Sequence, residues 1–164
     1  MSFPRISPER VSARATMEVS MTFEWLRMRI QEEQDRRRRE ASALDRLPRA
    51  MEELHGLLKD CIVSYNQAFG EQASDVQLHP DRIKVTAREE VEGKWQPSAK
   101  VEVTSVPDIP GFRVDRGEYS LAIEVGVLPS NKLYYRDCEQ DKYLTLEELT
   151  RRILDRAFFP KLKE

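Results

Sequence analysis

One long run of helix-spaced apolar residues constrains the fold of this chain more than any other feature. Between Leu26 and Phe69 the apolar positions recur mostly at steps of three, four or seven residues, which places them on one face of a helix. These positions are Leu26, Ile30, Ala41, Leu44, Met51, Leu54, Leu58, Ile62, Tyr65 and Phe69. A strand does not produce this spacing, so we expect helical structure along the whole stretch.

The section between Ile30 and Ala41 contains only charged and polar residues. A helix that is polar on all sides bridges solvent or is stabilised by charge pairs four residues apart. Three such pairs are available, namely Glu32–Arg36, Glu33–Arg37 and Asp35–Arg39. The acid precedes the base in each pair, which is the more favourable order. We therefore interpret this section as an exposed helix with little core packed against it.

Pro48 interrupts the apolar stripe. A proline inside a helix removes one backbone hydrogen bond and clashes with the carbonyl four residues earlier, here that of Leu44. One helix can end near Asp45 and a second can begin with Pro48 in its first turn, which would give a helical hairpin. The alternative is one continuous, kinked helix. We favour the break and predict two long N-terminal helices, at about residues 20–45 and 48–69.

Alternation of apolar and polar residues after Gly70 predicts antiparallel strands with one face on the core and one in water. The predicted sheet has four to five strands, at residues 76–78, 83–88, 101–105, 121–125 and 133–136. Helices followed by a block of strands indicate an α+β fold instead of a parallel α/β sheet.

The last predicted element is one C-terminal helix. Thr145 and Glu148 form a capping box, in which each side chain reaches the backbone amide of the other. Helix-spaced apolar residues follow, namely Leu146, Leu149, Ile153 and Ala157. Pro160 ends the helix.

A chain of 164 residues is expected to form one domain. Prolines and serines near the start predict a flexible arm over residues 1–16, ahead of a single α+β domain over residues 17–164. We expect that domain to be helical at 17–70, to have its sheet at 76–137 and to end with a helix at 145–159. Residues 17–24 fit a strand as well as a helix, and we favour a helix starting near Ser20.

Composition excludes several classes of protein. The net charge of −2 gives the whole chain no attraction to nucleic acid or to an anionic membrane. No apolar run approaches the roughly 18 residues of a membrane-spanning helix, and no apolar signal-peptide core follows Met1. Cys61 and Cys138 do not form a disulfide framework. We therefore expect a cytoplasmic protein that does not bind membranes.

The arginines of the first helices do not indicate a nucleic-acid partner. Eight arginines between Glu24 and Glu53 are matched by eight aspartates and glutamates. The counterion release that drives nucleic-acid binding would therefore be largely cancelled.

The best candidate for a chemical site is the segment of residues 137–148. Its oxygen-bearing side chains resemble the twelve-residue calcium loop of EF-hand proteins. The resemblance implies four candidate metal ligands, which are Asp137, Glu139, Asp141 and Glu148. Two features differ from that loop, since Lys142 replaces its glycine and residues 133–135 before it are predicted as strand. An acidic turn leading into a capped helix explains the same residues. We therefore predict no catalytic residue, cofactor or metal site.

Trp25 and Met28 lie away from the stripe that contains Leu26 and Ile30. Two large apolar side chains outside the main face indicate a second contact, either with another chain or with the sheet. Because isolated helices are marginal unless packed, we predict a non-enzymatic interaction module. It would form a homo-oligomer, such as a dimer, through its N-terminal helices, with these four residues at the interface. A different protein partner stays open.

The alternative function is a small-ligand binder or an enzyme with its site between the sheet and the helices. Its candidate lining residues are Tyr119, Tyr134, Tyr135 and Trp95. A calcium-responsive loop at residues 137–148 is a further alternative.

Overall fold

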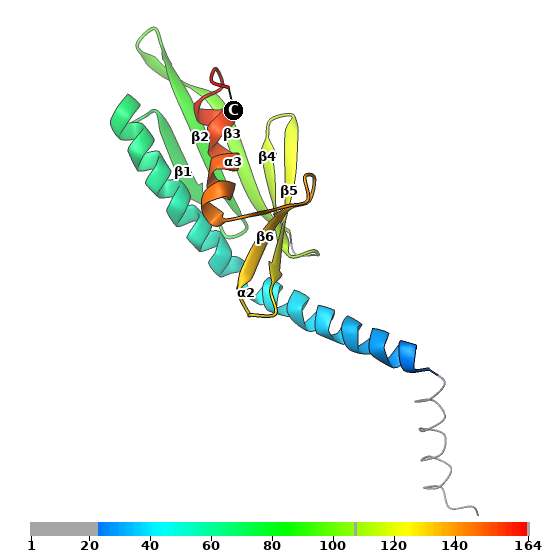
Figure 1. Cartoon of the computed structure of the whole chain (residues 1–164). Coiled ribbons are helices and arrows are strands. Elements are labelled where there is room, and N and C mark those ends of the chain that lie inside the picture. Colours follow the sequence, from blue (N-terminus) through cyan, green and yellow to red (C-terminus); the bar gives the residue numbers. More distant parts are fainter. Residues whose placement is uncertain (1–22, 107, 164) are drawn as a thin grey trace, which may run out of the picture. The chain divides into compact units, whose positions relative to one another are not determined.

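The computed structural model describes residues 23–106 and 108–163 (Figure 1). Within them, one 46-residue helix is followed by seven strands and one shorter helix. The chain divides into two compact units, and the boundary falls inside the long helix between Arg38 and Arg39. The predicted arm at residues 1–16 and the ambiguous residues 17–22 lie outside the described residues. The division into an arm and one domain therefore stays a prediction.

A single helix, α2 (Glu24–Phe69), replaces the two long N-terminal helices that we predicted. The predicted break at Pro48 is wrong, because the proline lies inside α2 with its side chain exposed. Neighbours on both sides of it are buried, namely Leu47, Ala50 and Met51. Packing of this kind supplies most of the stability of helices in proteins, and it offsets the hydrogen bond that the proline removes.

The buried face of α2 is also shifted from the predicted stripe. Ala43 and Leu47 are buried, whereas Ala41 is exposed and Leu44 is half-buried. The predicted positions Met51, Leu54, Leu58 and Ile62 are buried.

In the described part of the chain, all strands belong to one antiparallel sheet, in which they lie in sequence order. They are β1 (Ser74–Leu78), β2 (Arg82–Val91), β3 (Lys94–Val106), β4 (Gly111–Arg116), β5 (Tyr119–Val127), β6 (Leu133–Asp137) and β7 (Lys142–Leu144). The α+β class with an antiparallel sheet is confirmed. The predicted number of four to five strands is wrong, because β4 and β7 were missed.

One face of the sheet packs on the helices, and the other faces outward. In β2, Ile83 and Val85 are buried while Lys84 between them is partly exposed, as expected where successive side chains point to opposite faces. The inward-facing residues of the strands join the buried residues of α2 from Leu47 onward and those of the C-terminal helix in one core. Both helical segments therefore lie on the same face of the sheet (Figure 1).

The C-terminal helix, α3 (Leu146–Phe158), begins where the capping residue predicted it. The Thr145 hydroxyl accepts a hydrogen bond from the backbone amide of Glu148 at 3.1 Å. Leu149 and Ile153 of α3 are completely buried in the core, together with the inward-facing residues of the sheet. Neither described helix contains an apolar stretch long enough to cross a membrane.

Candidate functional site

Large apolar side chains at the start of α2 are exposed. The predicted interface residues have exposed fractions of 64% for Trp25, 41% for Leu26, 59% for Met28 and 48% for Ile30. Phe23, which the sequence analysis did not include, is 43% exposed, and its carbonyl accepts the first hydrogen bond of the helix. We call Phe23, Trp25, Leu26, Met28 and Ile30 the N-terminal apolar segment.

The N-terminal apolar segment is apolar on more than one side of the helix. Leu26 and Ile30 are four residues apart and share one face, whereas Trp25 and Met28 are three apart and share another. A helix that is apolar on most sides is normally buried. The exposure of all these side chains therefore marks a surface that suits contact with another molecule.

The polar section that follows is organised by exposed ion pairs. Glu33 accepts hydrogen bonds from Arg36 at 2.8 Å and from Arg37 at 3.0 Å, which confirms the predicted Glu33–Arg37 pair. These hydrogen bonds lower the pKa of Glu33 to about 2. Arg29 pairs with Glu32 at 2.7 Å as well. Charge pairs at these spacings support a solvated helix, and the carboxylates balance the charge of the paired arginines.

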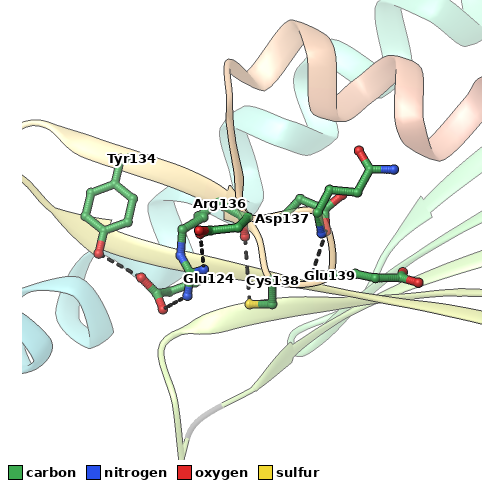
Figure 2. A network of polar contacts seen from close by, with 8 residues as sticks. Glu124, Tyr134, Arg136, Asp137, Cys138 and Glu139 are labelled. Carbon is green, nitrogen blue, oxygen red and sulfur yellow. Dashed lines mark hydrogen bonds and ion pairs between the residues drawn. The ribbon is translucent and has the colours of Figure 1, made fainter.

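Asp137, the first of the predicted calcium ligands, is a structural residue at the end of β6. Its side chain is completely buried, and one carboxylate oxygen accepts a hydrogen bond from Arg152 of α3 at 2.6 Å. The other oxygen accepts hydrogen bonds from the backbone amides of Glu139 at 2.9 Å and Gln140 at 3.1 Å (Figure 2). These three hydrogen bonds satisfy the buried charge and fix the turn between β6 and β7.

The other candidate ligands do not converge on a common point. Glu139 accepts a hydrogen bond from the Tyr119 hydroxyl at 2.9 Å, and Asp141 pairs with Arg136 at 2.8 Å. The segment continues as β7 and α3 instead of forming a loop between two helices. Among the residues that the structure describes, no group of three or more His, Cys, Asp and Glu side chains could hold a metal ion. The geometry therefore gives the calcium hypothesis no support.

A second polar network lies on the outward face of β5 and β6. Arg136 donates to Glu124 at 2.9 Å, and the Tyr134 hydroxyl donates to the same carboxylate at 2.8 Å (Figure 2). The hydrogen bond from Arg136 lowers the pKa of Glu124. Burial, followed by the hydrogen bond to Glu124, raises the pKa of Tyr134 to about 12. The hydrogen bonds connect β5 to β6, and they accompany pKa shifts of Glu124 and Tyr134 away from neutrality, whereas a general acid or base works best with a pKa near the operating pH.

The aromatic residues proposed to line a ligand site are separated by the fold. Tyr135 is buried next to Phe112 in the core, whereas its neighbour Tyr134 points to the opposite face of the sheet. Trp95 lies against Gly70, and Tyr119 is half exposed. These four side chains do not form a shared pocket.

An apolar groove between the second half of α2 and α3 was not predicted from the sequence. It has a volume of about 650 Å³. An aromatic cluster forms one end, in which the rings of Tyr65 and Phe158 stack with centroids 4.1 Å apart. Phe69 and Phe159 lie 4.8 and 5.9 Å from Tyr65. Cys61 and Leu154 extend the apolar lining.

Two other hollows in the molecule are lined by charges of both signs. One, of about 890 Å³, contains Lys84 and Glu102, which pair at 3.7 Å. The other, of about 740 Å³, contains the Asp137–Arg152 pair. Paired charges of this kind do not define the sign of a ligand.

Comparison of the chain with protein-family models, with curated proteins and with solved structures gives no match. The function of this protein is therefore inferred from its own exposed segment and groove.

Proposed function

We propose that this protein is a non-enzymatic interaction module that self-associates through the N-terminal apolar segment. The observation that carries the proposal is the exposure of Trp25 and Met28, which are 64% and 59% accessible on a regular helix. Tryptophan is among the residues that most often dominate the binding energy of protein interfaces.

The energetic reason is the apolar surface that association would remove from water. Complete burial of a large apolar side chain contributes about 1.5–3 kcal/mol relative to leaving it exposed. Several such side chains on one short helical segment can offset part of the entropic cost of association. The charged section between Ile30 and Ala41 is solvated, so the proposed apolar contact is confined to the first turns of α2.

The test is sedimentation velocity at micromolar concentration. We expect the unmodified chain to sediment as a dimer, and Trp25→Gln combined with Met28→Gln to shift it to monomer. Val63→Gln is the matched control, because Val63 is also on α2 and is 48% exposed. A monomeric unmodified chain, or a dimer that the double variant leaves intact, would overturn the proposal.

Both cysteines are free thiols. A reducing compartment such as the cytoplasm suits such thiols, and we propose that location for the protein.

A further inference from the structure

We propose that the hollow of about 890 Å³ beside β3 binds an extended peptide of another protein that ends in a free carboxylate. The peptide would pair with the open edge of β3 and would present its terminal carboxylate to Arg116 and Lys100. The residues of this hollow are separate in sequence from the N-terminal apolar segment, so the proposal does not depend on self-association.

Strand β3 has an edge that β4 leaves open. It pairs with β2 from Lys94 to Thr104, whereas its pairing with β4 covers only Glu102–Val106. The hairpin of β2 and β3 therefore extends beyond the end of β4 (Figure 1). The unpaired N–H and C=O groups of such an edge form a template for an added strand.

The backbone of Lys100 is directed toward this open edge. Ser105 donates its amide hydrogen to the carbonyl of Asp81, on the β2 side of β3, at 3.0 Å. Backbone groups of successive residues in an antiparallel strand alternate between its two neighbours, so Glu102 and Lys100 point the other way. Glu102 faces Asp115 of β4, but Lys100 lies beyond the last pair. The N–H and C=O of Lys100 are therefore available to an added chain.

The hollow lies against the same edge. Residues 98–101 of β3 line one part of it, and residues 115–117 at the end of β4 and Arg156 of α3 line others. A chain beside Lys100 cannot continue as a strand toward Glu102, because β4 already occupies that position. The hollow therefore suits a chain that ends there, and chain ends carry a free carboxylate or a free amine.

The charges of the hollow select the carboxylate. Both of its acidic residues, Glu102 and Asp115, are already paired with cations, at 3.7 and 3.1 Å. Within residues 23–106 and 108–163, by contrast, no ion pair forms at Lys100, and no carboxylate pairs with Arg116. These two cations favour an anionic chain end over a cationic one.

Arg116 also has an unused hydrogen-bond donor. Its Nη1 donates to the carbonyl of Arg152 in α3 at 2.6 Å, and its guanidinium carbon lies 5.3 Å from the centroid of the Tyr119 ring. Its Nε is buried and has no hydrogen-bond partner in the described part of the chain. A buried donor without an acceptor costs stability, and a planar guanidinium matches the geometry of a carboxylate. A carboxylate in the hollow would supply the counter-charge that Arg116 lacks and an acceptor for its guanidinium.

A second copy of this chain is not the expected occupant. Pro97 has no N–H and lies in the open section of β3, and a proline on an edge strand discourages continuous pairing. Two β3 edges paired antiparallel about Pro97 would also place Lys94 of one copy opposite Lys100 of the other. Like charges directly opposite each other are destabilising. The occupant is therefore a different polypeptide, paired over the short stretch next to the hollow.

Titration of the full chain with synthetic peptides, followed by amide shifts in nitrogen–proton NMR spectra, tests the proposal. The probe is an acetylated hexapeptide of alternating threonine and valine with a free C-terminal carboxylate. Its matched control is the same peptide with a C-terminal amide. We expect the free-carboxylate peptide to shift the amide of Lys100 saturably and to bind about tenfold more tightly than the control. Equal binding of the two peptides, or no shift with either at about millimolar concentration, would overturn the proposal.

Substitutions test the two residues assigned to the carboxylate. Lys100→Gln and Arg116→Gln should each weaken binding of the free-carboxylate peptide by about tenfold, because each removes a charged partner. Lys94→Gln is the matched control, since Lys94 is exposed on the same strand outside the hollow, and it should leave binding unchanged. Circular dichroism checks that Arg116→Gln folds, and Lys100→Gln, at an exposed position, keeps the test decisive if it does not. Unchanged binding in Lys100→Gln would contradict the assignment.

Two further measurements separate other occupants. Shifts of the Lys100 amide that grow with protein concentration in the absence of peptide would assign the edge to a second copy. Inorganic phosphate that binds as tightly as the peptide would make the hollow a simple anion site. Either result would overturn the proposal, and neither changes the outcome of the sedimentation test of self-association.

Discussion

Arg152 of α3 donates a hydrogen bond of 2.6 Å to the completely buried carboxylate of Asp137 at the end of β6. This pair connects α3 to the end of β6. The same carboxylate binds the amides of Glu139 and Gln140, so the pair also holds the β6–β7 turn. Because the carboxylate has no access to water, its charge depends entirely on these protein partners.

Arg152→Ala should therefore destabilise the fold strongly. The substitution leaves a buried carboxylate without its counter-charge, and breaking a buried pair in this way costs about 3 kcal/mol or more. Urea unfolding followed by circular dichroism measures the loss. Arg151→Ala is the control, because Arg151 is an exposed neighbour on the same helix, and we expect it to change the free energy of unfolding by less than about 0.5 kcal/mol. Equal effects of the two variants would show that the ion pair is not structural.

Gly126→Ala should displace the ring of Tyr134. A Cβ atom at Gly126 would overlap the end of that ring, so the hydroxyl would move away from Glu124. We expect the pKa of Tyr134 to fall from about 12 toward its ordinary value. The overpacking should also cost about 1–3 kcal/mol of stability. A pH titration of tyrosinate absorbance measures the change, and Tyr134→Phe identifies which transition belongs to Tyr134.

The control for this substitution is Gly56→Ala. Gly56 lies inside α2 and has open space around the position of a Cβ atom. Alanine in a helix interior is favoured over glycine by about 0.5–1 kcal/mol, so this variant should gain stability and leave the titration of Tyr134 unchanged. An unchanged titration in Gly126→Ala would contradict the packing of the ring on the glycine.

The contribution of Glu124 to the free energy of unfolding depends on pH and is lost in acid. Its pKa is lowered in the folded state by Arg136, so the stabilisation is present above the ordinary carboxyl pKa and is lost as pH falls through the folded value. The difference in unfolding free energy between the unmodified chain and Glu124→Gln should be largest near neutral pH and should shrink in acid. Denaturant titrations across that range measure it. Glu118→Gln, in an exposed turn, should show no such trend; a constant difference for Glu124→Gln would contradict the shift.

Local signals predicted the beginning of α3 and most strands, because the information lay within a few residues. Thr145 is a favoured N-cap, and its hydroxyl indeed caps the helix. Alternation around Ile83 and Val85 likewise located β2. The strand β4 has only two completely buried side chains in alternation, Phe112 and Val114, and β7 has three residues. With so few alternating apolar residues, neither segment was distinguished from a turn by its sequence pattern.

Non-local packing explains the remaining errors. Pro48 disfavours a helix locally, yet the burial of Leu47 and Met51 in the sheet core carries α2 through it. The groove was also not predictable from the sequence, since Tyr65 and Phe158 are in contact although the strands β1 to β7 lie between them along the chain. The exposed residues Trp25 and Met28 were identified because helical spacing alone separates them from the main stripe.

Thermal stability should depend on protein concentration if the N-terminal apolar segment joins two copies. A dimer that is more stable than its monomers unfolds at a temperature that rises with total protein, because dissociation accompanies unfolding. We expect this rise for the unmodified chain and a concentration-independent midpoint for Trp25→Gln combined with Met28→Gln. Differential scanning calorimetry over a hundredfold range of concentration, about micromolar to about tenth-millimolar, measures it. Val63→Gln should keep the concentration dependence of the unmodified chain, because that exposed side chain lies on α2 far along the sequence from the segment. The unfolding midpoint of the unmodified chain could instead stay constant while sedimentation reports a dimer. That result would mean that association contributes nothing to folding stability. The segment would then be a weak contact between already stable monomers.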